Sequence, residues 1–310
     1  MLKLAAIVGP TAVGKTELSI SVAQNLGGEI ISCDSMQVYQ GMDIGTAKAS
    51  LSQRKIIAHH LIDIVEPDIN FTVADYQKLA KQKILNITEH GHIPILVGGT
   101  GLYYQSVVDN YDFFPMESLQ TVRSKWEQVC QEKGLEYLFE QLVMVDREYA
   151  LKIGGNDKKR IIRALEVYDL TGQPFSSIQN RNINTYLLAA VGLYLDRAEL
   201  YNRIEQRVET MIKGGLIEEV AELRARGYDL SMNSMQALGY KQVYNYLEGM
   251  LTYEVMVYEI KKETRNFAKR QYTWFNKDKR IKWYNITDYS NPDILLEKIC
   301  ELMEGLLLRV

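Results

Sequence analysis

The sequence predicts an α/β fold, in which a parallel β-sheet is flanked by helices and a mostly helical insertion interrupts the sheet-forming chain. Short, continuously apolar segments alternate with amphipathic helical segments along the N-terminal third, which is typical of parallel sheets buried on both faces. From about Asp112 the strand patterns give way to charged helical ones, and an apolar strand pattern returns at Leu187–Leu195. We therefore divide the 310 residues into a core of residues 1–111 and 188–310 and an insertion of residues 112–187.

The first apolar segment, Leu4–Val8, leads into a loop with the G-x-x-x-x-G-K-T pattern and then into an amphipathic helix, the context expected of a phosphate-binding P-loop. Glycines allow several backbone N–H groups to point at one anion, and the helix N-terminus adds partial positive charge. Lys15 supplies a further positive charge, and the Thr16 hydroxyl can hold Mg²⁺. We expect a di- or triphosphate site, with a tight turn and an exposed lysine as the alternative. Its predicted residues are Gly9, Thr11, Ala12, Val13, Gly14, Lys15 and Thr16.

Further apolar and amphipathic segments complete a P-loop NTPase-like sheet. The sequence predicts three strands and a long helix, at Glu29–Cys33, His60–Val65, Ile93–Val97 and Thr72–Glu89. In parallel sheets, ligands bind at the C-terminal ends of the strands. The phosphate loop, Asp34-Ser35 and the glycine turn Gly98-Gly99-Thr100-Gly101 each follow a strand, so we expect them to converge on one cleft.

Two of these strand ends carry candidate functional groups. Asp34 suits a magnesium holder acting through water, a general base or a turn carboxylate, and the sequence does not separate these roles. A P-loop ATPase or kinase would be expected to have a second apolar strand that ends in an acidic residue holding magnesium. The sequence has no strand that clearly ends in such a residue, which weakens the interpretation as an ATPase or a kinase. The glycine turn allows close backbone approach to a ligand, and Thr100 adds a hydroxyl; an ordinary strand-to-helix turn is the alternative.

The second half of the chain reads mostly as helix. Helical patterns are expected at Leu119–Leu142, from Asn156 to Gly172, at Arg197–Lys213, around Met235–Lys241, at Tyr253–Phe275 and at Ile294–Leu308, with a strand at Arg280–Tyr284.

Basic residues gather in two of these helices, although the net charge is −3. Four of the six residues from Lys158 to Arg163 are cationic, and Lys262, Arg265 and Lys269 lie on one helical stripe with aromatic residues between them. Phosphate backbones favour such stripes, and unstacked RNA bases favour aromatic platforms. RNA is therefore an expected partner, with a merely solvated cationic surface as the alternative.

Apolar runs and cysteine spacing in the sequence indicate in which cellular compartment the protein is expected to act. The sequence has no apolar run of membrane-spanning length and no room for a secretory signal before its first strand, so no membrane association is expected. Cys33, Cys130 and Cys300 are too far apart to suggest a disulfide framework or a zinc site, which fits a reducing cytoplasm. We expect a cytoplasmic monomer.

Taken in order, the motifs resemble those of the tRNA dimethylallyltransferases, also called tRNA isopentenyltransferases. The likeness runs nearly end to end, and its ordered set is more specific than any single motif. The absence of a zinc-finger extension suggests the bacterial type. The matching segments are Gly9–Thr16, Asp34–Tyr39, Asp43–Lys48, Gly98–Tyr103, Asn156–Asp157 with Lys159–Arg160 and Arg163–Glu166, Met235–Lys241, and Thr264–Arg265 with Ala268–Trp274.

The resemblance implies transfer of a dimethylallyl group from dimethylallyl diphosphate to N6 of the adenosine 3′-adjacent to the anticodon of tRNA, with Mg²⁺ as cofactor. Asp34 would be the general base, and Thr16 and Arg207 would act on the diphosphate. The residues expected to contact the tRNA anticodon stem-loop are Ser35, Met36, Gln37, Val38, Thr100, Arg123, Lys159, Arg160 and Arg163. An isopentenyltransferase of free adenine nucleotides, a small-molecule kinase that uses ATP and a non-catalytic RNA-binding protein are the alternatives.

Overall fold

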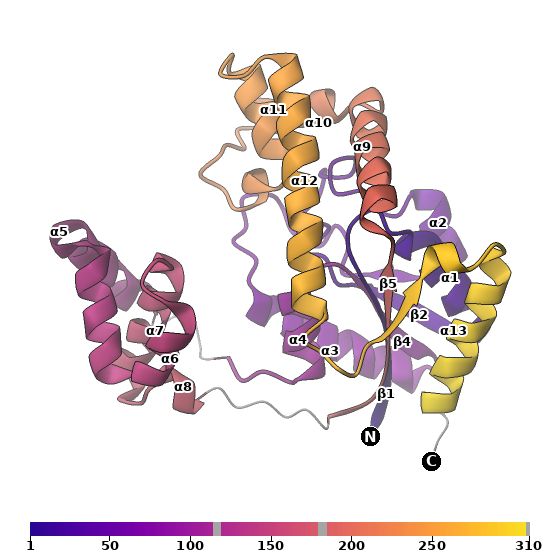
Figure 1. The fold of residues 1–310 in the computed structure, drawn as a ribbon, viewed down its shortest axis with the longest axis horizontal. Helices are drawn as coiled ribbons and strands as arrows, with labels where there is room; N and C mark the ends of the chain where they lie inside the picture. Colours follow the sequence, from indigo (N-terminus) through magenta and orange to yellow (C-terminus); the bar gives the residue numbers. More distant parts are fainter. Residues whose placement is uncertain (114–118, 179–184, 308–310) are drawn as a thin grey trace. The chain divides into compact units, whose positions relative to one another are not determined.

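The computed structural model describes residues 1–113, 119–178 and 185–307 (Figure 1). The chain divides into two units, which we call the core unit, Met1–Val108 with Asn184–Val310, and the insertion unit, Asp109–Ile183. The boundaries expected from the sequence were residues 112 and 187. The second of these is too late, because the strand that returns the chain to the sheet already begins at Tyr186.

The core unit contains a six-stranded sheet in the order β3-β2-β4-β1-β5-β6. Every pair of neighbouring strands is parallel, which confirms the predicted sheet type. β1 lies between β4 and β5, so the phosphate loop that follows β1 emerges from the middle of the sheet. The strands are β1 Leu2–Val8, β2 Gly28–Ser32, β3 His59–His60, β4 Ile93–Gly98, β5 Tyr186–Tyr194 and β6 Lys282–Asn285.

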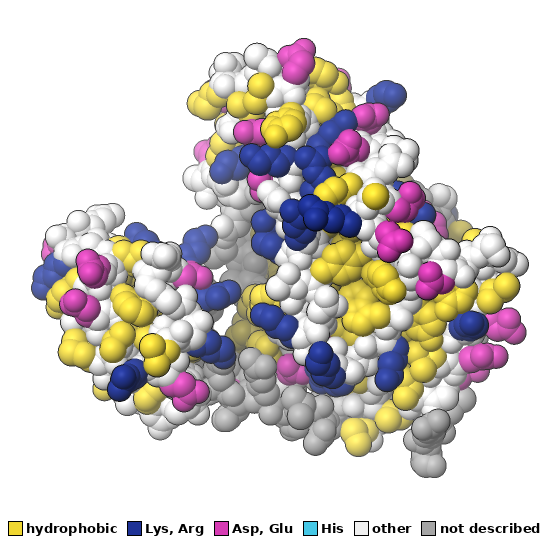
Figure 2. Space-filling model, in the orientation of Figure 1, with side chains coloured by type: hydrophobic (Ala, Val, Ile, Leu, Met, Phe, Trp, Pro, Cys, Tyr) yellow, Lys and Arg dark blue, Asp and Glu magenta, His cyan; other side chains and the backbone are white. Residues whose placement is uncertain are grey.

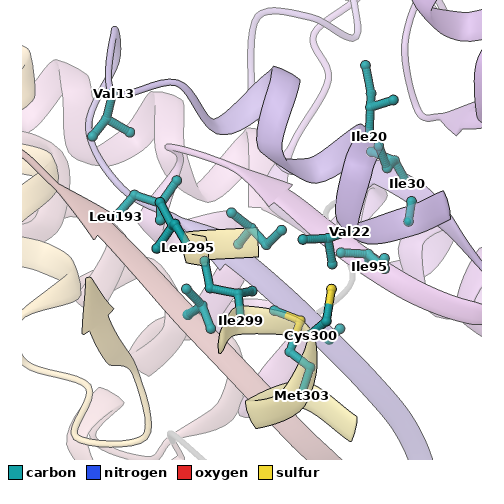
Figure 3. Close-up of a cluster of buried hydrophobic side chains, with 14 of the residues drawn as sticks. Val13, Ile20, Val22, Ile30, Ile95, Leu193, Leu295, Ile299, Cys300 and Met303 are labelled. Carbon is teal, nitrogen blue, oxygen red and sulfur yellow. The ribbon is translucent and has the colours of Figure 1, made fainter. Parts of the chain in front are cut away.

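Helices cover both faces of this sheet (Figure 1). Alternate residues of β1 point to opposite faces, so Ala5 and Ile7 join one buried cluster with α1 and α13 (Figure 3), while Leu4 and Ala6 join another with α3 and α4. The helices of the core unit are α1 Lys15–Leu26, α2 Leu51–Ile56, α3 Val73–Glu89, α4 Gly101–Val108, α9 Arg197–Lys213, α10 Leu216–Ala225, α11 Tyr240–Leu247, α12 Tyr253–Phe275 and α13 Pro292–Leu307.

A third buried cluster joins α9, α10, α11 and α12 to the segment after β2, through residues such as Val208, Leu223 and Tyr240. Its helices fit the predicted patterns closely at α9 and α12, where the apolar period is long and regular. This helical layer supplies one wall of the site described below.

Two predicted elements differ from the structure. The strand expected at His60–Val65 ends at His60, because Leu61 and Asp63 adopt left-handed backbone angles, with φ of 60° and 55°. The helix expected around Met235–Lys241 is instead a 3₁₀ turn, Ser234–Gln236, followed by α11, since Gly239 (φ 92°) breaks the chain direction between them. Leu308, the predicted end of the last helix, lies outside the described residues.

The insertion unit is helical, with its own small core around Leu138, Leu142 and Ile161. Asp157 caps its longest unbroken helix, accepting a hydrogen bond from the N–H of Arg160, and Gly172 ends that helix in the left-handed conformation. Gly134 interrupts the preceding helical segment with non-helical angles. The helices are α5 Leu119–Val145, α6 Arg147–Ile153, α7 Lys158–Thr171 and α8 Phe175–Ile178.

None of the helices in the described part of the chain is long and apolar enough to cross a lipid bilayer.

Candidate active site

A cavity of about 670 Å³ lies in the core unit, at the carboxyl ends of β1, β2 and β4. Thr11, Lys15 and Thr16 from the phosphate loop line it, together with Asp34 after β2 and Thr100 after β4. The three separated segments therefore converge as the strand order requires. α9, α10 and α12 contribute further lining residues, among them Arg207, Leu216 and Gln271.

The phosphate loop presents a row of free backbone donors. Gly14 (φ 94°) and Ala12 (φ 65°) adopt left-handed angles, which turn successive N–H groups toward the same side. In the described structure, the N–H groups from Ala12 to Thr16 have no hydrogen-bond partner, whereas that of Thr11 is bonded. Gly9 is required for another reason: a Cβ there would lie 2.6 Å from the carbonyl oxygen of Leu193 in β5.

Lys15 folds back over its own loop. Its Nζ donates hydrogen bonds to the carbonyl oxygens of Gly9 (3.0 Å) and Pro10 (2.7 Å). Burial, with a smaller contribution from the positive charge of Arg207, lowers the pKa of Lys15 to about 7, and Asp34 opposes this shift. The charged form of Lys15 is therefore disfavoured mainly by its removal from solvent.

Arg207 extends this positive region from α9. Burial lowers its pKa from the ordinary value, and the carboxylates of Asp34 and Glu17 oppose that effect. Within the described residues Arg207 forms no ion pair, whereas Arg203, one turn earlier, pairs with Glu199 at 2.8 Å. Arg207 is thus the arginine of this helix that remains available to an anion in the cavity.

Asp34 uses its two carboxylate oxygens differently. Oδ1 accepts hydrogen bonds from the N–H groups of Met36 (2.8 Å) and Gln37 (3.4 Å), so the turn-carboxylate interpretation is correct for that oxygen. Oδ2 has no hydrogen-bond partner in the described part of the chain. One oxygen therefore fixes the orientation of the side chain, and the other is free for chemistry in the cavity.

The residues predicted to lie beside Asp34 are fixed in place by hydrogen bonds. The Thr100 hydroxyl accepts a hydrogen bond from the N–H of Ser35 at 3.0 Å, which ties the end of β4 to the segment after β2. Gln37 accepts from the Ser32 hydroxyl at 2.9 Å and donates to the carbonyl oxygen of Thr46 at 3.2 Å. Ser35, Met36, Gln37 and Thr100 all line the cavity.

Three of the predicted site residues in the core unit do not line it. Val13 is fully buried under the phosphate loop, and Gly9 acts through its carbonyl oxygen and its lack of a side chain. Val38 is also fully buried, and its carbonyl oxygen accepts the N–H groups of Ile64 and Val65. The Val38 side chain thus belongs to the apolar core and its carbonyl oxygen is occupied, and the expected contact of Val38 with tRNA stays a prediction.

The glycine turn is shaped by packing more than by ligand access. A Cβ on Gly98 would overlap the backbone of Cys33, one on Gly99 would overlap Gln271, and one on Gly101 would overlap the ring of Trp274. Two of these three neighbours belong to α12. Close approach of α12 therefore accounts for Gly99 and Gly101, and the backbone of Cys33 accounts for Gly98, whereas the sequence pattern alone attributed these glycines to a ligand.

The segment from Asp43 to Lys48 was not among the predicted site residues, although Thr46, Ala47 and Lys48 line the cavity. Its backbone is anchored by the Glu219 carboxylate of α10, which accepts the N–H groups of Asp43 (2.9 Å) and Ile44 (2.8 Å). The Lys48 side chain is buried between Asp43 and Asp63. The segment Asp43–Lys48 is one of the motifs on which the family resemblance rests, so the sequence marked it as important. No local sequence pattern, however, indicates that it contacts Glu219.

In the insertion unit, the predicted tRNA-binding arginines surround one buried acid. Glu166 is 1% exposed and lies 3.4 Å from both Arg123 and Arg163. Burial raises the pKa of Glu166, and the two arginines oppose the shift. Arg160 pairs with Asp157 at 3.3 Å, and Lys159 is exposed without an ion pair among the described residues.

In the core unit, Lys and Arg side chains gather along α12 (Figure 2). Lys261 and Arg265 pair with Glu209 and Glu205 of α9, both at 2.7 Å, whereas the predicted stripe residue Lys262 has no ion pair among the described residues. Among the same residues, no group of three or more His, Cys, Asp or Glu side chains could hold a metal ion.

Comparisons with known sequences agree on one family. The sequence model of the family "IPP transferase" matches residues 37–278. A tRNA dimethylallyltransferase of Syntrophomonas wolfei is 63% identical and aligns over 98% of this chain and 98% of its own length. One from Carboxydothermus hydrogenoformans is 52% identical over 96% of this chain and 95% of its own length.

Solved structures give the same result. The full-length tRNA isopentenylpyrophosphate transferase of Bacillus halodurans is 41% identical, with a TM-score of 0.76, and the alignment covers 99% of this chain and 97% of that one. A eukaryotic dimethylallyltransferase described as acting on tRNA is 29% identical, with a TM-score of 0.80, over 94% of this chain and 76% of its own.

Proposed function

The chain belongs to the IPP transferase family, and we propose that it transfers a dimethylallyl group from dimethylallyl diphosphate to N6 of the adenosine 3′-adjacent to the anticodon in tRNA, releasing diphosphate. One observation carries this proposal beyond the family likeness. A carboxylate with one free oxygen, Asp34, shares a cavity with the free loop amides, Lys15 and Arg207. The cavity therefore offers a proton acceptor beside a grip for an anionic leaving group.

The leaving group is held by the phosphate loop. As the allylic C–O bond of dimethylallyl diphosphate breaks, its electron pair stays on the diphosphate, where negative charge builds up. The N–H groups from Ala12 to Thr16, which have no partner in the described structure, would donate hydrogen bonds to that charge, and Lys15 and Arg207 would stabilise it further. These donors are already oriented before the reaction, so they stabilise the developing charge without reorganising.

Asp34 acts on the nucleophile. The N6 amine attacks the allylic carbon, and its proton passes to Oδ2 of Asp34, while Oδ1 stays bound to the N–H of Met36. A proton acceptor is needed because the N6 lone pair is delocalised into the adenine ring. Ser35, Gln37 and Thr100 form the wall beside Asp34, where an adenine taken out of its stack would be held.

The residues present fit a magnesium ion. The Thr16 hydroxyl lies at the N-terminus of α1, lines the cavity and has no hydrogen-bond partner among the described residues. In P-loops the Ser or Thr hydroxyl at this position holds Mg²⁺, and substrate phosphates and water complete its coordination. When bound there, Mg²⁺ would neutralise part of the diphosphate charge.

The anticodon stem-loop would be bound by basic residues of the insertion unit. Arg123, Lys159, Arg160 and Arg163 form a cluster suited to phosphate contacts. A cytoplasmic site of action is proposed from the tRNA substrate and the three free cysteines.

One experiment separates this proposal from its alternatives. The protein is incubated with labelled dimethylallyl diphosphate and Mg²⁺ and, in parallel, with unmodified tRNA or AMP, and separately with labelled ATP alone. We expect label on tRNA only, at N6 of the adenosine next to the anticodon. Label on AMP but not on tRNA would instead indicate an enzyme of free nucleotides, and phosphoryl transfer from ATP would indicate a kinase.

A further inference from the structure

One side chain joins the two halves of the cavity. Gln271 of α12 is 5% exposed. Its Oε1 accepts a hydrogen bond from the N–H of Thr11 in the phosphate loop at 2.8 Å. Its Nε2 donates to the carbonyl oxygen of Gly99 in the glycine turn at 3.0 Å. The first part of the phosphate loop and the turn after β4 are therefore linked through one amide.

The chemistry of these partners makes a glutamine the specific requirement. Thr11 offers a donor and Gly99 an acceptor, so the bridging group must accept at one end and donate at the other. A primary amide does both, while a carboxylate only accepts and a hydrocarbon does neither. Gly99 has no room for a Cβ because Gln271 occupies that space, so the contact is close-packed as well as hydrogen-bonded.

Each end of the bridge leads to a different part of the reaction. After Thr11 come the N–H groups of Ala12 to Thr16, which have no partner in the described structure and would bind the diphosphate. After Gly99 comes Thr100, whose hydroxyl holds the N–H of Ser35 next to Asp34. The amide thus sets the distance between the leaving-group site and the base site.

We propose that Gln271 is a positioning residue that holds the phosphate loop in register with the Thr100–Asp34 side of the cavity. The inference rests on the proposed function in taking a diphosphate as the loop's ligand. Without the bridge, the partly buried N–H of Thr11 is left unpaired, and the loop turns to satisfy it. The row of amides that follows then no longer points at one anion.

Two variants of Gln271 test this. Gln271→Met keeps most of the volume and removes both hydrogen bonds, whereas Gln271→Glu keeps the acceptor for Thr11 and loses the donor to Gly99. Binding of inorganic diphosphate with Mg²⁺ is measured by calorimetry, and steady-state kinetics give kcat and the KM for each substrate. For Gln271→Met we expect diphosphate affinity to fall about 10-fold and kcat about 10- to 100-fold, the scale of a misplaced reacting group, with the KM for tRNA unchanged.

Gln271→Glu allows a measurement, the pH dependence of diphosphate affinity, that would not change if Gln271 had a purely structural role. Once protonated, a glutamic acid can again donate to the carbonyl oxygen of Gly99 while accepting from Thr11. Its diphosphate affinity should therefore recover toward the wild-type value as the pH is lowered, relative to wild type at the same pH. This variant also keeps the test available if Gln271→Met does not fold.

The neighbouring residue provides a matched control. Tyr272 anchors the same helix to the end of β5, accepting the N–H of Leu195 at 3.1 Å, and among the described residues it has no hydrogen bond to the phosphate loop or to the glycine turn. Tyr272→Phe should lower the melting temperature without changing diphosphate affinity. If Gln271→Met does the same and no more, Gln271 only supports the fold and the proposal is overturned.

The two proposals fail separately. If the wild-type protein attaches no dimethylallyl group to tRNA, the proposed function is wrong, and diphosphate binding still tests Gln271. If the wild type is active and both Gln271 variants bind diphosphate as it does, the inference about Gln271 alone is wrong.

Discussion

Lys15 and Arg207 lie close enough in the core unit for the charge of the arginine to lower the pKa of the lysine. Burial contributes more to this shift, and together they bring the pKa of Lys15 to about 7. The two cations come from the phosphate loop and from α9 and share one cavity. Such a pair repels itself until an anion binds between its members, so it favours a multiply charged ligand.

The first prediction concerns proton uptake. A bound diphosphate should raise the pKa of Lys15 above its value of about 7 in the free protein, so binding takes up a proton in the pH range between the two values. The lysine's contribution to affinity is complete below pH 7 and is lost as the pH rises through that range. Calorimetry of diphosphate binding in buffers of different ionisation enthalpy measures the uptake.

Lys15→Arg is the control for this prediction, because an arginine keeps its proton throughout the range. Its proton uptake then reports only the ligand's own titration. Equal uptake in wild type and variant at pH 8 would contradict a lowered pKa for Lys15.

The second prediction tests the free oxygen of Asp34. In Asp34→Asn the side-chain carbonyl oxygen can still accept the N–H of Met36, so the turn and the tRNA affinity should be retained. Turnover should fall by about 10²- to 10⁴-fold, the range for losing a general base. Single-turnover assays with saturating tRNA measure it, with Asp68→Asn, an exposed carboxylate outside the cavity, as the control. Normal turnover in Asp34→Asn would remove this residue from the chemistry.

The third prediction concerns the basic surface of the insertion unit. Replacing Lys159, Arg160 and Arg163 together by alanine should weaken tRNA binding and reduce the slope of log affinity against log salt. Each lost phosphate contact should lower that slope by roughly 0.7–0.9. Titrations at several salt concentrations measure the effect. A charge-matched variant with alanine at the exposed Lys55, Lys78 and Lys298 should keep the wild-type slope, and a slope equal in both variants would mean that the basic helix is only solvated.

The fourth prediction concerns the anchor of the segment from Asp43 to Lys48. Glu219 accepts the N–H groups of Asp43 and Ile44 and the hydroxyl of Tyr240. Glu219→Gln makes one of these acceptors a donor, so the free energy of unfolding should fall by about 1–3 kcal/mol. Denaturant titration measures it, with the exposed Glu222→Gln on the same helix as the control. Equal stability of the two variants would contradict the anchoring role.

Local patterns in the sequence were enough for the parallel sheet, the phosphate loop and the positions of Asp34 and Thr100. A P-loop between an apolar strand and a helix specifies its own conformation, and parallel strands bring their carboxyl ends to one edge. The long regular helices α9 and α12 were also readable, since their apolar period repeats over several turns. Short or irregular elements were not, because left-handed angles at Leu61 and Asp63 leave no signal in hydrophobic periodicity.

Only the tertiary structure decided which groups are free and which are already bound. Thr11 and Gln271 are 260 residues apart in the chain, and no local pattern specifies that one accepts a hydrogen bond from the other. The same holds for the glycine turn, where Gly99 and Gly101 accommodate α12, and for Val38, which the helical layer buries. Periodicity and turn chemistry depend on neighbours along the chain, whereas hydrogen-bond partners and burial depend on how all the elements pack together.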